Sequence, residues 1–166
     1  MAIPTEPLRS EHRELLPHLD ELRVLADGIG RWSTHWTDRV AGTVTFLRQD
    51  LVPHARAEEA VLYPEVERLL GAPGATATMA ADHIDIVARI DQLDRSVTTL
   101  GSDAPDEAKA NELRAQLYGL WAILLLHFRK EEEVLLPVVD AKVNADQASV
   151  LFARMGAVAH GTAPAP

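Results

Sequence analysis

An eleven-residue segment occurs twice in this chain, and the repeat limits the possible folds more than any other feature. The copies, His54–Pro64 and His127–Pro137, align without a gap and share the pattern His-x-Arg-x-Glu-Glu-x-Val-Leu-x-Pro. Each copy is preceded, some forty residues upstream, by another histidine that follows an acidic residue. These upstream pairs are Glu11-His12 and Asp82-His83. The chain therefore consists of two similar units, each of which supplies His and then His-x-x-x-Glu.

Apolar side chains recur every three to four residues, whereas no alternating apolar and polar stretch of useful length occurs. This period is typical of helices, so we predict an all-α chain. Segments rich in Gly and Pro separate the helical stretches. Four long helices are expected at about Glu6–Asp27, from between Arg31 and Asp38 to Leu70, at Thr78–Leu100, and from the loop at 101–105 to an end or kink at Pro137; a short fifth helix follows Asn144 or Asp146.

Several details of these helices follow from local residue chemistry. Thr5 is placed to cap the first helix, and the loop at 101–105 is expected to supply a cap for the fourth. Pro53 and Pro64 should bend the second helix, because proline lacks a backbone donor and crowds the preceding turn. A constant helical period also predicts inward positions for Glu65 on the second helix and for Val134 and Val138 on the fourth. The fifth helix carries Val150, Leu151 and Met155.

Six ionisable side chains fall on the inward stripes, where their burial is costly unless another group compensates them. A step of four residues advances roughly 400° and 6 Å along a helix, so the His and Glu of each repeat share a face. Repetition of this arrangement favours a shared metal site over isolated core histidines. The predicted ligands are His12, His54, Glu58, His83, His127 and Glu131.

The remaining acidic and imidazole groups are expected to lie outside the site. Glu59, Glu132 and Glu133 are predicted to surround the ligands or face solvent, although Glu132 remains an alternative to Glu131. His18 is predicted to lie off the inward stripe, His35 in or near the connection between the first two helices, and His160 in the C-terminal tail.

The ligand types restrict the metal. The chain has no cysteine, and imidazole with carboxylate suits iron, manganese, zinc or copper. Six ligands are enough for two ions if both glutamates bridge them. Ferritin-like di-iron proteins use Glu with Glu-x-x-His, in which the acid comes first, so the opposite order in this chain argues against that fold.

Composition restricts partners and location. The formal net charge of −9 argues against binding to nucleic acid or an anionic membrane surface. No apolar run approaches the roughly eighteen residues of a membrane span, and residues 1–6 lack the features of a secretory signal. We therefore expect a soluble, cytoplasmic protein with one domain at 1–160 and a disordered tail at 161–166.

The pattern H, HxxxE, H, HxxxE resembles that of the hemerythrin-like HHE cation-binding domain family, from His12 to Pro137. The resemblance implies an up-down-up-down antiparallel four-helix bundle, here with a short C-terminal fifth helix. It also implies two non-haem iron ions joined by an oxo or hydroxo bridge. In this family arrangement His12 and His54 would bind one iron, His83 and His127 the other, and Glu58 and Glu131 would bridge them.

Oxygen-carrying hemerythrins have an additional histidine one turn after the histidine of the third helix, where this chain has Val87. Reversible oxygen carriage is therefore not expected. One hypothesis is a di-iron protein that binds or reduces a small ligand, O2, H2O2 or NO, with weak catalase-like activity. The alternative is a non-enzymatic iron or oxygen sensor or an iron-handling module. The third hypothesis is a structural bundle whose site takes zinc or stays without metal.

Overall fold

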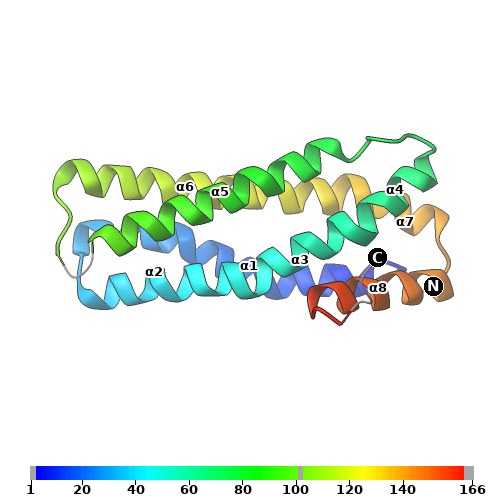
Figure 1. The fold of residues 1–166 in the computed structure, drawn as a ribbon, viewed down its shortest axis with the longest axis horizontal. Helices are drawn as coiled ribbons and strands as arrows, with labels where there is room; N and C mark the ends of the chain where they lie inside the picture. The colour runs from blue at the N-terminus through cyan, green and yellow to red at the C-terminus, as the bar shows by residue number, and fades with distance from the viewer. Residues whose placement is uncertain (1–2, 101–102, 163–166) are drawn as a thin grey trace.

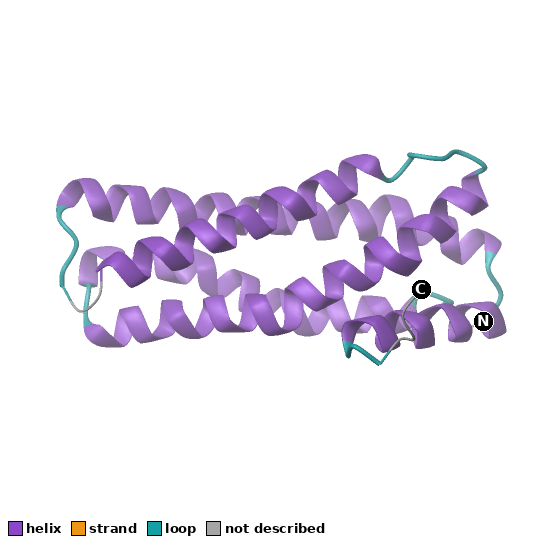
Figure 2. Cartoon of the chain, viewed as in Figure 1, coloured by secondary structure: helices purple, strands orange, loops and turns teal. Residues whose placement is uncertain are grey.

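The computed structural model describes residues 3–100 and 103–162 of the chain. Within these residues every regular element is helical and no strand occurs, as Figure 2 shows, so the predicted all-α class is confirmed. None of the helices in these two ranges is long and apolar enough to cross a lipid bilayer. Of the predicted disordered tail, residues 163–166 lie outside the described residues.

The described helices form four long rods, which lie side by side in Figure 1. The first rod packs against the second and the fourth, and the third rod also packs against the second and the fourth. A shorter helix, α8, follows the fourth rod and packs against α3 and η3 of the second. The rods comprise α1 (Glu6–Gly28) with η1 (Ile29–Arg31); α2 (Thr34–Phe46), η2 (Leu47–Leu51), α3 (Val52–Ala57), η3 (Glu58–Leu62) and α4 (Tyr63–Leu70); α5 (Ala77–Leu100); and α6 (Glu107–Lys130), η4 (Glu131–Leu135) and α7 (Leu136–Lys142); α8 is Ala145–Ala159.

Side-chain caps define where several helices begin. Ser33 caps α2 by accepting a hydrogen bond from the backbone N–H of Trp36. Asn144, one of the two predicted candidates, caps α8 and forms a reciprocal capping box with Gln147. The cap of α6 is Asp106, just beyond the loop in which we expected it.

Thr5 is the N-cap residue of α1, as predicted, but its side chain accepts no hydrogen bond from the backbone N–H groups of that helix. Its hydroxyl donates instead to Asp140 of α7, 2.8 Å away, and its backbone N–H contacts the same carboxylate oxygen. The Thr5 oxygen accepts a hydrogen bond from Nε of Arg9 at 3.0 Å, so a side chain takes the acceptor that a cap would use. Thr5 thus joins the beginning of the first rod to the end of the fourth.

Three π-helical turns, η2, η3 and η4, interrupt the second and fourth rods. In each case a proline is the second residue of the α-helix that follows: Pro53, Pro64 and Pro137. A proline ring clashes with the carbonyl four residues earlier, and a wider turn relieves that clash. The fourth rod therefore continues beyond Pro137 to Lys142, rather than ending there.

Each π-turn inserts one residue relative to an α-helix, so the buried face moves by one position. The inward placement of Glu65 is wrong, because Glu65 is only half-buried and the buried side chain is Val66. On the fourth rod Val134 is 58% exposed, Val138 is half-buried, and their neighbours Leu135 and Val139 face the core instead. On α8, Leu151 and Met155 are buried, whereas Val150 is exposed.

The core comprises two apolar clusters, and the polar site lies between them along every rod. On α1 the order is Leu8 of one cluster, then His12, then Leu15 of the other. On α5 it is Met79, His83 and Ile86. The ionisable layer is therefore enclosed by apolar side chains at both ends, which shields it from bulk water.

Candidate metal centre

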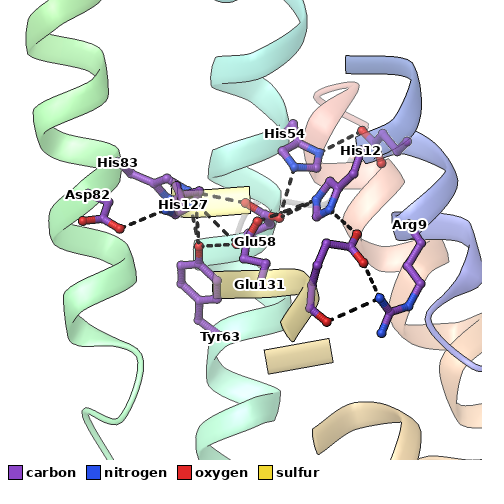
Figure 3. A network of polar contacts seen from close by, with 11 residues as sticks. Arg9, His12, His54, Glu58, Tyr63, Asp82, His83, His127 and Glu131 are labelled. Atoms are coloured by element: carbon purple, nitrogen blue, oxygen red, sulfur yellow. Dashed lines mark hydrogen bonds and ion pairs between the residues drawn. The ribbon is translucent and has the colours of Figure 1, made fainter. Parts of the chain in front are cut away.

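The structure brings the six predicted ligands together between the four rods (Figure 3). Each rod supplies one histidine, and the second and fourth rods also supply a glutamate at the first residue of a π-turn. All six residues are buried, with exposed fractions between 0% and 4%. The residues, with their elements, are His12 of α1, His54 of α3, Glu58 of η3, His83 of α5, His127 of α6 and Glu131 of η4.

The potential ligand atoms form two groups that share both glutamates. In each group, one ligand atom per residue can be chosen so that all four lie within 4.8 Å of one another. One group contains His12, His54 and both glutamates, whereas the other contains His83, His127 and the same two glutamates. Such an arrangement matches two neighbouring cation positions.

Each glutamate presents one oxygen to each histidine pair. Oε1 of Glu58 lies 3.1 Å from Nε2 of His54, and its Oε2 lies 3.4 Å from Nε2 of His83. Glu131 behaves in the same way, with Oε2 3.6 Å from Nε2 of His12 and Oε1 3.4 Å from Nε2 of His127. The two carboxylates are therefore oriented as bridges between the two positions.

Several buried atoms in this cluster have no hydrogen-bond partner among the described residues. They include Nε2 of His12 and His54, both oxygens of Glu58 and Oε2 of Glu131. Leaving polar atoms unpaired in a dry core costs free energy. Nitrogen and oxygen lone pairs that converge in this way fit a metal ion, which takes them as ligands and neutralises the carboxylates.

The pair His83 and His127 gives a second indication of a shared cation. Their Nε2 atoms lie 2.8 Å apart, while each Nδ1 lies within hydrogen-bond distance of a carboxylate. An ionised carboxylate only accepts hydrogen bonds, so each Nδ1 carries the proton and neutral rings would face one another with lone pairs. A proton or a metal ion must therefore lie between the two rings.

A ring of outer carboxylates orients the four histidines. Glu11 accepts a hydrogen bond from His54 at 2.9 Å, Glu59 from His83 at 2.8 Å, Asp82 from His127 at 3.1 Å, and Glu132 from His12 at 2.7 Å. A carboxylate on Nδ1 fixes the tautomer that exposes Nε2 and increases its basicity as a ligand. All four imidazoles are thus prepared in the same way.

The outer ring follows the order of the rods. The acidic residue of each of the first three rods accepts a hydrogen bond from the histidine of the next rod. The acidic residue of the fourth rod accepts one from the histidine of the first. The sequence shows the acids beside His12 and His83, and it predicts Glu59 and Glu132 outside the ligands. It does not predict which acidic residue pairs with which histidine of another rod. The only indication in the sequence was that an acidic residue recurs beside a ligand in each rod.

These contacts also set the protonation of the metal-free cluster. The hydrogen bond from His54 lowers the pKa of Glu11. Burial alone would lower the pKa of His54, but Glu58 and Glu11 outweigh it and raise that pKa well above its ordinary value. Burial likewise opposes ionisation of Glu58, yet His54 and the neighbouring histidines hold its pKa well below the usual range. Without metal, His54 therefore favours the imidazolium form and Glu58 the carboxylate form.

Tyr63 is a residue of the site that sequence reasoning missed. Its buried phenol donates to Oε1 of Glu131 at 2.8 Å and lies 3.3 Å and 3.4 Å from Nε2 of His83 and His127. Burial and the nearby carboxylates Glu58 and Glu131 raise the phenol pKa, which keeps it a donor. In the repeat, Tyr63 aligns with Leu136, and this mismatch was the available signal. The two histidine pairs therefore have different surroundings.

The histidines predicted to lie outside the site do so. His18 is exposed and stacks on Phe46 with ring centroids 4.0 Å apart, and His35 and His160 are exposed as well. Glu133 is exposed and pairs with Arg129. Glu132 contacts His12 through Nδ1 and also pairs with Arg9, so it lies behind the ligand ring rather than within it.

The comparisons agree with this geometry. The family described as Hemerythrin HHE cation binding domain matches residues 3–139, a range that includes all six clustered residues and excludes α8. Searches of curated proteins and of solved structures gave no significant match. Since the family match covers well over half of the chain, the chain belongs to the hemerythrin HHE cation-binding domain family.

Proposed function

We propose that the protein holds two non-haem iron ions joined by an oxo or hydroxo bridge. The supporting observation is that both groups of potential ligand atoms share the carboxylates of Glu58 and Glu131. In this proposal Glu58 and Glu131 bridge the ions, while His12 and His54 bind one iron and His83 and His127 bind the other. The potential ligand atoms are all nitrogen or oxygen, and such a set suits iron.

The proposed reaction is binding or reduction of O2, H2O2 or NO, with weak catalase-like turnover of peroxide. A bound iron pair supplies redox and Lewis-acid chemistry. The chain contributes the surroundings: apolar clusters exclude water, the outer carboxylates hold the imidazoles, and Tyr63 presents a hydroxyl donor beside Glu131. The hydroxyl lies next to the His83 and His127 pair, so a ligand bound there would receive its hydrogen bond in place of Glu131.

A sensor or iron-handling role is the alternative, and the burial of the cluster supports it. Without metal, the structure must keep two carboxylates and four imidazoles in a dry core, which is costly. Metal binding would therefore be strongly coupled to the stability of the bundle. A large change in stability with iron or with its oxidation state would be the signal that such a module transmits.

One experiment separates the two roles. Iron-loaded protein is assayed for peroxide decay, and the thermal unfolding of metal-free, ferrous and ferric forms is compared. Turnover that is lost in His54→Ala but retained in His35→Ala supports the catalytic role, because His35 is exposed and outside the cluster. A redox-dependent shift in unfolding temperature without turnover supports the sensor, and absence of both contradicts the proposal.

The bundle topology and the domain limits are part of the same proposal. We infer that the four rods alternate in direction, because short connections join successive rods and neighbouring rods pack along their lengths. Residues 1–160 would then form one domain around the two apolar clusters.

A further inference from the structure

Two adjoining cavities open beside His54, where α1, the second rod and α8 meet. Their volumes are about 310 Å³ and 360 Å³, and they share five lining residues: Glu11, Glu14, His54, Ala159 and His160. We call the two cavities together the His54 groove. It reaches the back of a proposed metal ligand from the surface and has room for a hydrated ion.

The chemistry of the groove lining favours a cation. Glu11, Glu14 and Asp50 contribute carboxylates, and His18 and His160 contribute imidazoles. No Lys or Arg is among the described residues that line it. Carboxylate and imidazole are the donors that divalent first-row metals accept. Clefts lined by one sign of charge also concentrate ions of the opposite sign.

The opposite side of the same histidine pair has different chemistry. A groove beside His12 is lined by three arginines and one carboxylate around an apolar floor that includes Phe128; the charged residues are Arg9, Arg13, Arg129 and Glu132. Guanidinium groups repel a metal ion, so this second groove is unfavourable for cation uptake. The two grooves thus differ in charge although both reach a ligand of the same proposed metal position.

The inner end of the His54 groove leads to potential metal-ligand atoms that have no hydrogen-bond partner among the described residues. His54 is 3% exposed, and its Nε2 has no hydrogen-bond partner within the described residues. Its Nδ1 is bonded to Glu11, whose side chain is half-exposed and lines both cavities. A rotation of Glu11 toward solvent would release the His54 ring, so this pair separates the groove from the cluster.

Helix α8 and its C-cap residue form one wall of the groove, with Phe152, Met155, Gly156, Ala159 and His160. This helix lies beyond the residues that match the family, although it packs on the rod that carries His54. Gly156 lines one of the cavities, and a Cβ atom at this position would meet no atom within 4 Å, so a larger side chain has space there. Helix α8 therefore contributes one wall of the His54 groove, and the first and second rods supply the other lining residues.

We propose that the His54 groove is the route by which a divalent metal ion reaches the buried centre. Glu14, Asp50, His18 and His160 collect the hydrated ion, and Glu11 with His54 passes it inward. This inference rests on the proposed metal-binding function but concerns the rate and path of uptake. The two ideas can therefore fail separately: final metal content tests the function, and uptake rate tests the route.

The first test blocks the groove. Metal-free protein is mixed with Co²⁺, uptake is followed by visible absorption, and final content is measured by metal analysis. Gly156→Leu should slow uptake severalfold and leave the final content unchanged, because leucine favours the helix and its side chain would occupy the cavity of about 360 Å³ that Gly156 lines. Gly42→Leu is the matched control, since Gly42 is an exposed helical glycine outside the groove where a Cβ atom would likewise meet no atom within 4 Å.

The second test removes charge. Glu14→Gln/Asp50→Asn should slow uptake about tenfold at low ionic strength, and added salt should narrow the difference. Asp38→Asn/Glu112→Gln changes the net charge equally, outside the groove, and should retain the wild-type rate. The route is overturned if Gly156→Leu loads at the wild-type rate, or if only Leu125→Trp, in the groove beside His12, slows loading. Wild-type protein that takes up no metal would overturn both ideas.

Discussion

The carboxylate of Glu132 lies 2.7 Å from Nδ1 of His12, although the two residues are 120 positions apart in the sequence. This contact joins the fourth rod to the first and closes the ring of outer carboxylates. Glu132 also receives a contact from Arg9, which holds it behind the imidazole. It follows that the acid adjacent to a ligand in sequence orients a ligand on another rod.

Replacing Glu132 therefore tests the outer ring. Glu132→Leu should lower metal affinity by about 10–100-fold, because the Nδ1 donor of His12 loses its acceptor. Glu132→Gln retains an acceptor oxygen and should lose less. Glu133→Leu is the matched control, since Glu133 is exposed and pairs with Arg129. Titration with a competing chelator measures the affinities; equal loss in Glu132→Leu and Glu133→Leu would remove Glu132 from this role.

The bridging carboxylates are tested by isosteric substitution. Glu58→Gln and Glu131→Gln should each abolish the optical spectrum of the bridged iron pair, because an amide cannot supply a negative bridging ligand. Glu59→Gln should leave the spectrum nearly intact, since Glu59 contacts only the outer nitrogen of His83. The opposite ranking of Glu58→Gln and Glu59→Gln would refute the assignment of the bridge.

The repeat predicts that its two histidines contribute alike. His54→Ala and His127→Ala should cause similar losses of bound iron, because each removes one imidazole from an equivalent group of four. Iron content per chain after purification under identical iron supply provides the measurement. Full loading of either variant would exclude that histidine as a ligand.

Tyr63 should matter for stability as well as for the site. Tyr63→Phe leaves Oε1 of Glu131 without its donor, and loss of such a buried hydrogen bond should lower the free energy of unfolding by about 1–3 kcal/mol. Urea unfolding of the metal-free protein measures this loss. Tyr118→Phe is the control, because the Tyr118 hydroxyl bonds to Asp27 near the surface. No difference between the two variants would show that the Tyr63 contact is dispensable.

The pKa directions predict how metal-free stability depends on pH. The pKa values of His54 and His127 are raised above the ordinary histidine value of 6.5, so their protonated forms stabilise the fold. This stabilisation is complete below pH 6.5 and is lost as the pH rises through the raised pKa values. The lowered pKa values of Glu11 and Glu58 contribute stability above pH 4.5 that is lost as the pH falls. Metal-free protein should therefore be most stable between these limits.

Metal loading should remove the alkaline part of this dependence, because a bound cation replaces the protons of the cluster. The difference in unfolding temperature between loaded and metal-free protein should accordingly widen as the pH rises from about 6 to about 9. Parallel curves for the two forms over this range would contradict the assignment of His54 and His127 to the metal cluster.

The sequence was sufficient to predict the helical class and the six clustered residues, because duplication of His-x-x-x-Glu is visible without tertiary information. Glu65 and Val134 were misplaced because a constant period of about 3.6 cannot register the residue that each π-turn adds. The proline that follows each of these turns was the sequence feature that could have indicated the extra residue. The pairing of Glu132 with His12 depends on which rods are neighbours, which local pattern does not reveal.

The central claim is tested most directly by iron analysis combined with the optical spectrum of protein isolated with adequate iron. We predict about two iron atoms per chain, from the two ligand groups, and near-ultraviolet absorption from the oxo-bridged ferric pair. A saturated content of one iron per chain, or zinc throughout without this absorption, would contradict the di-iron account.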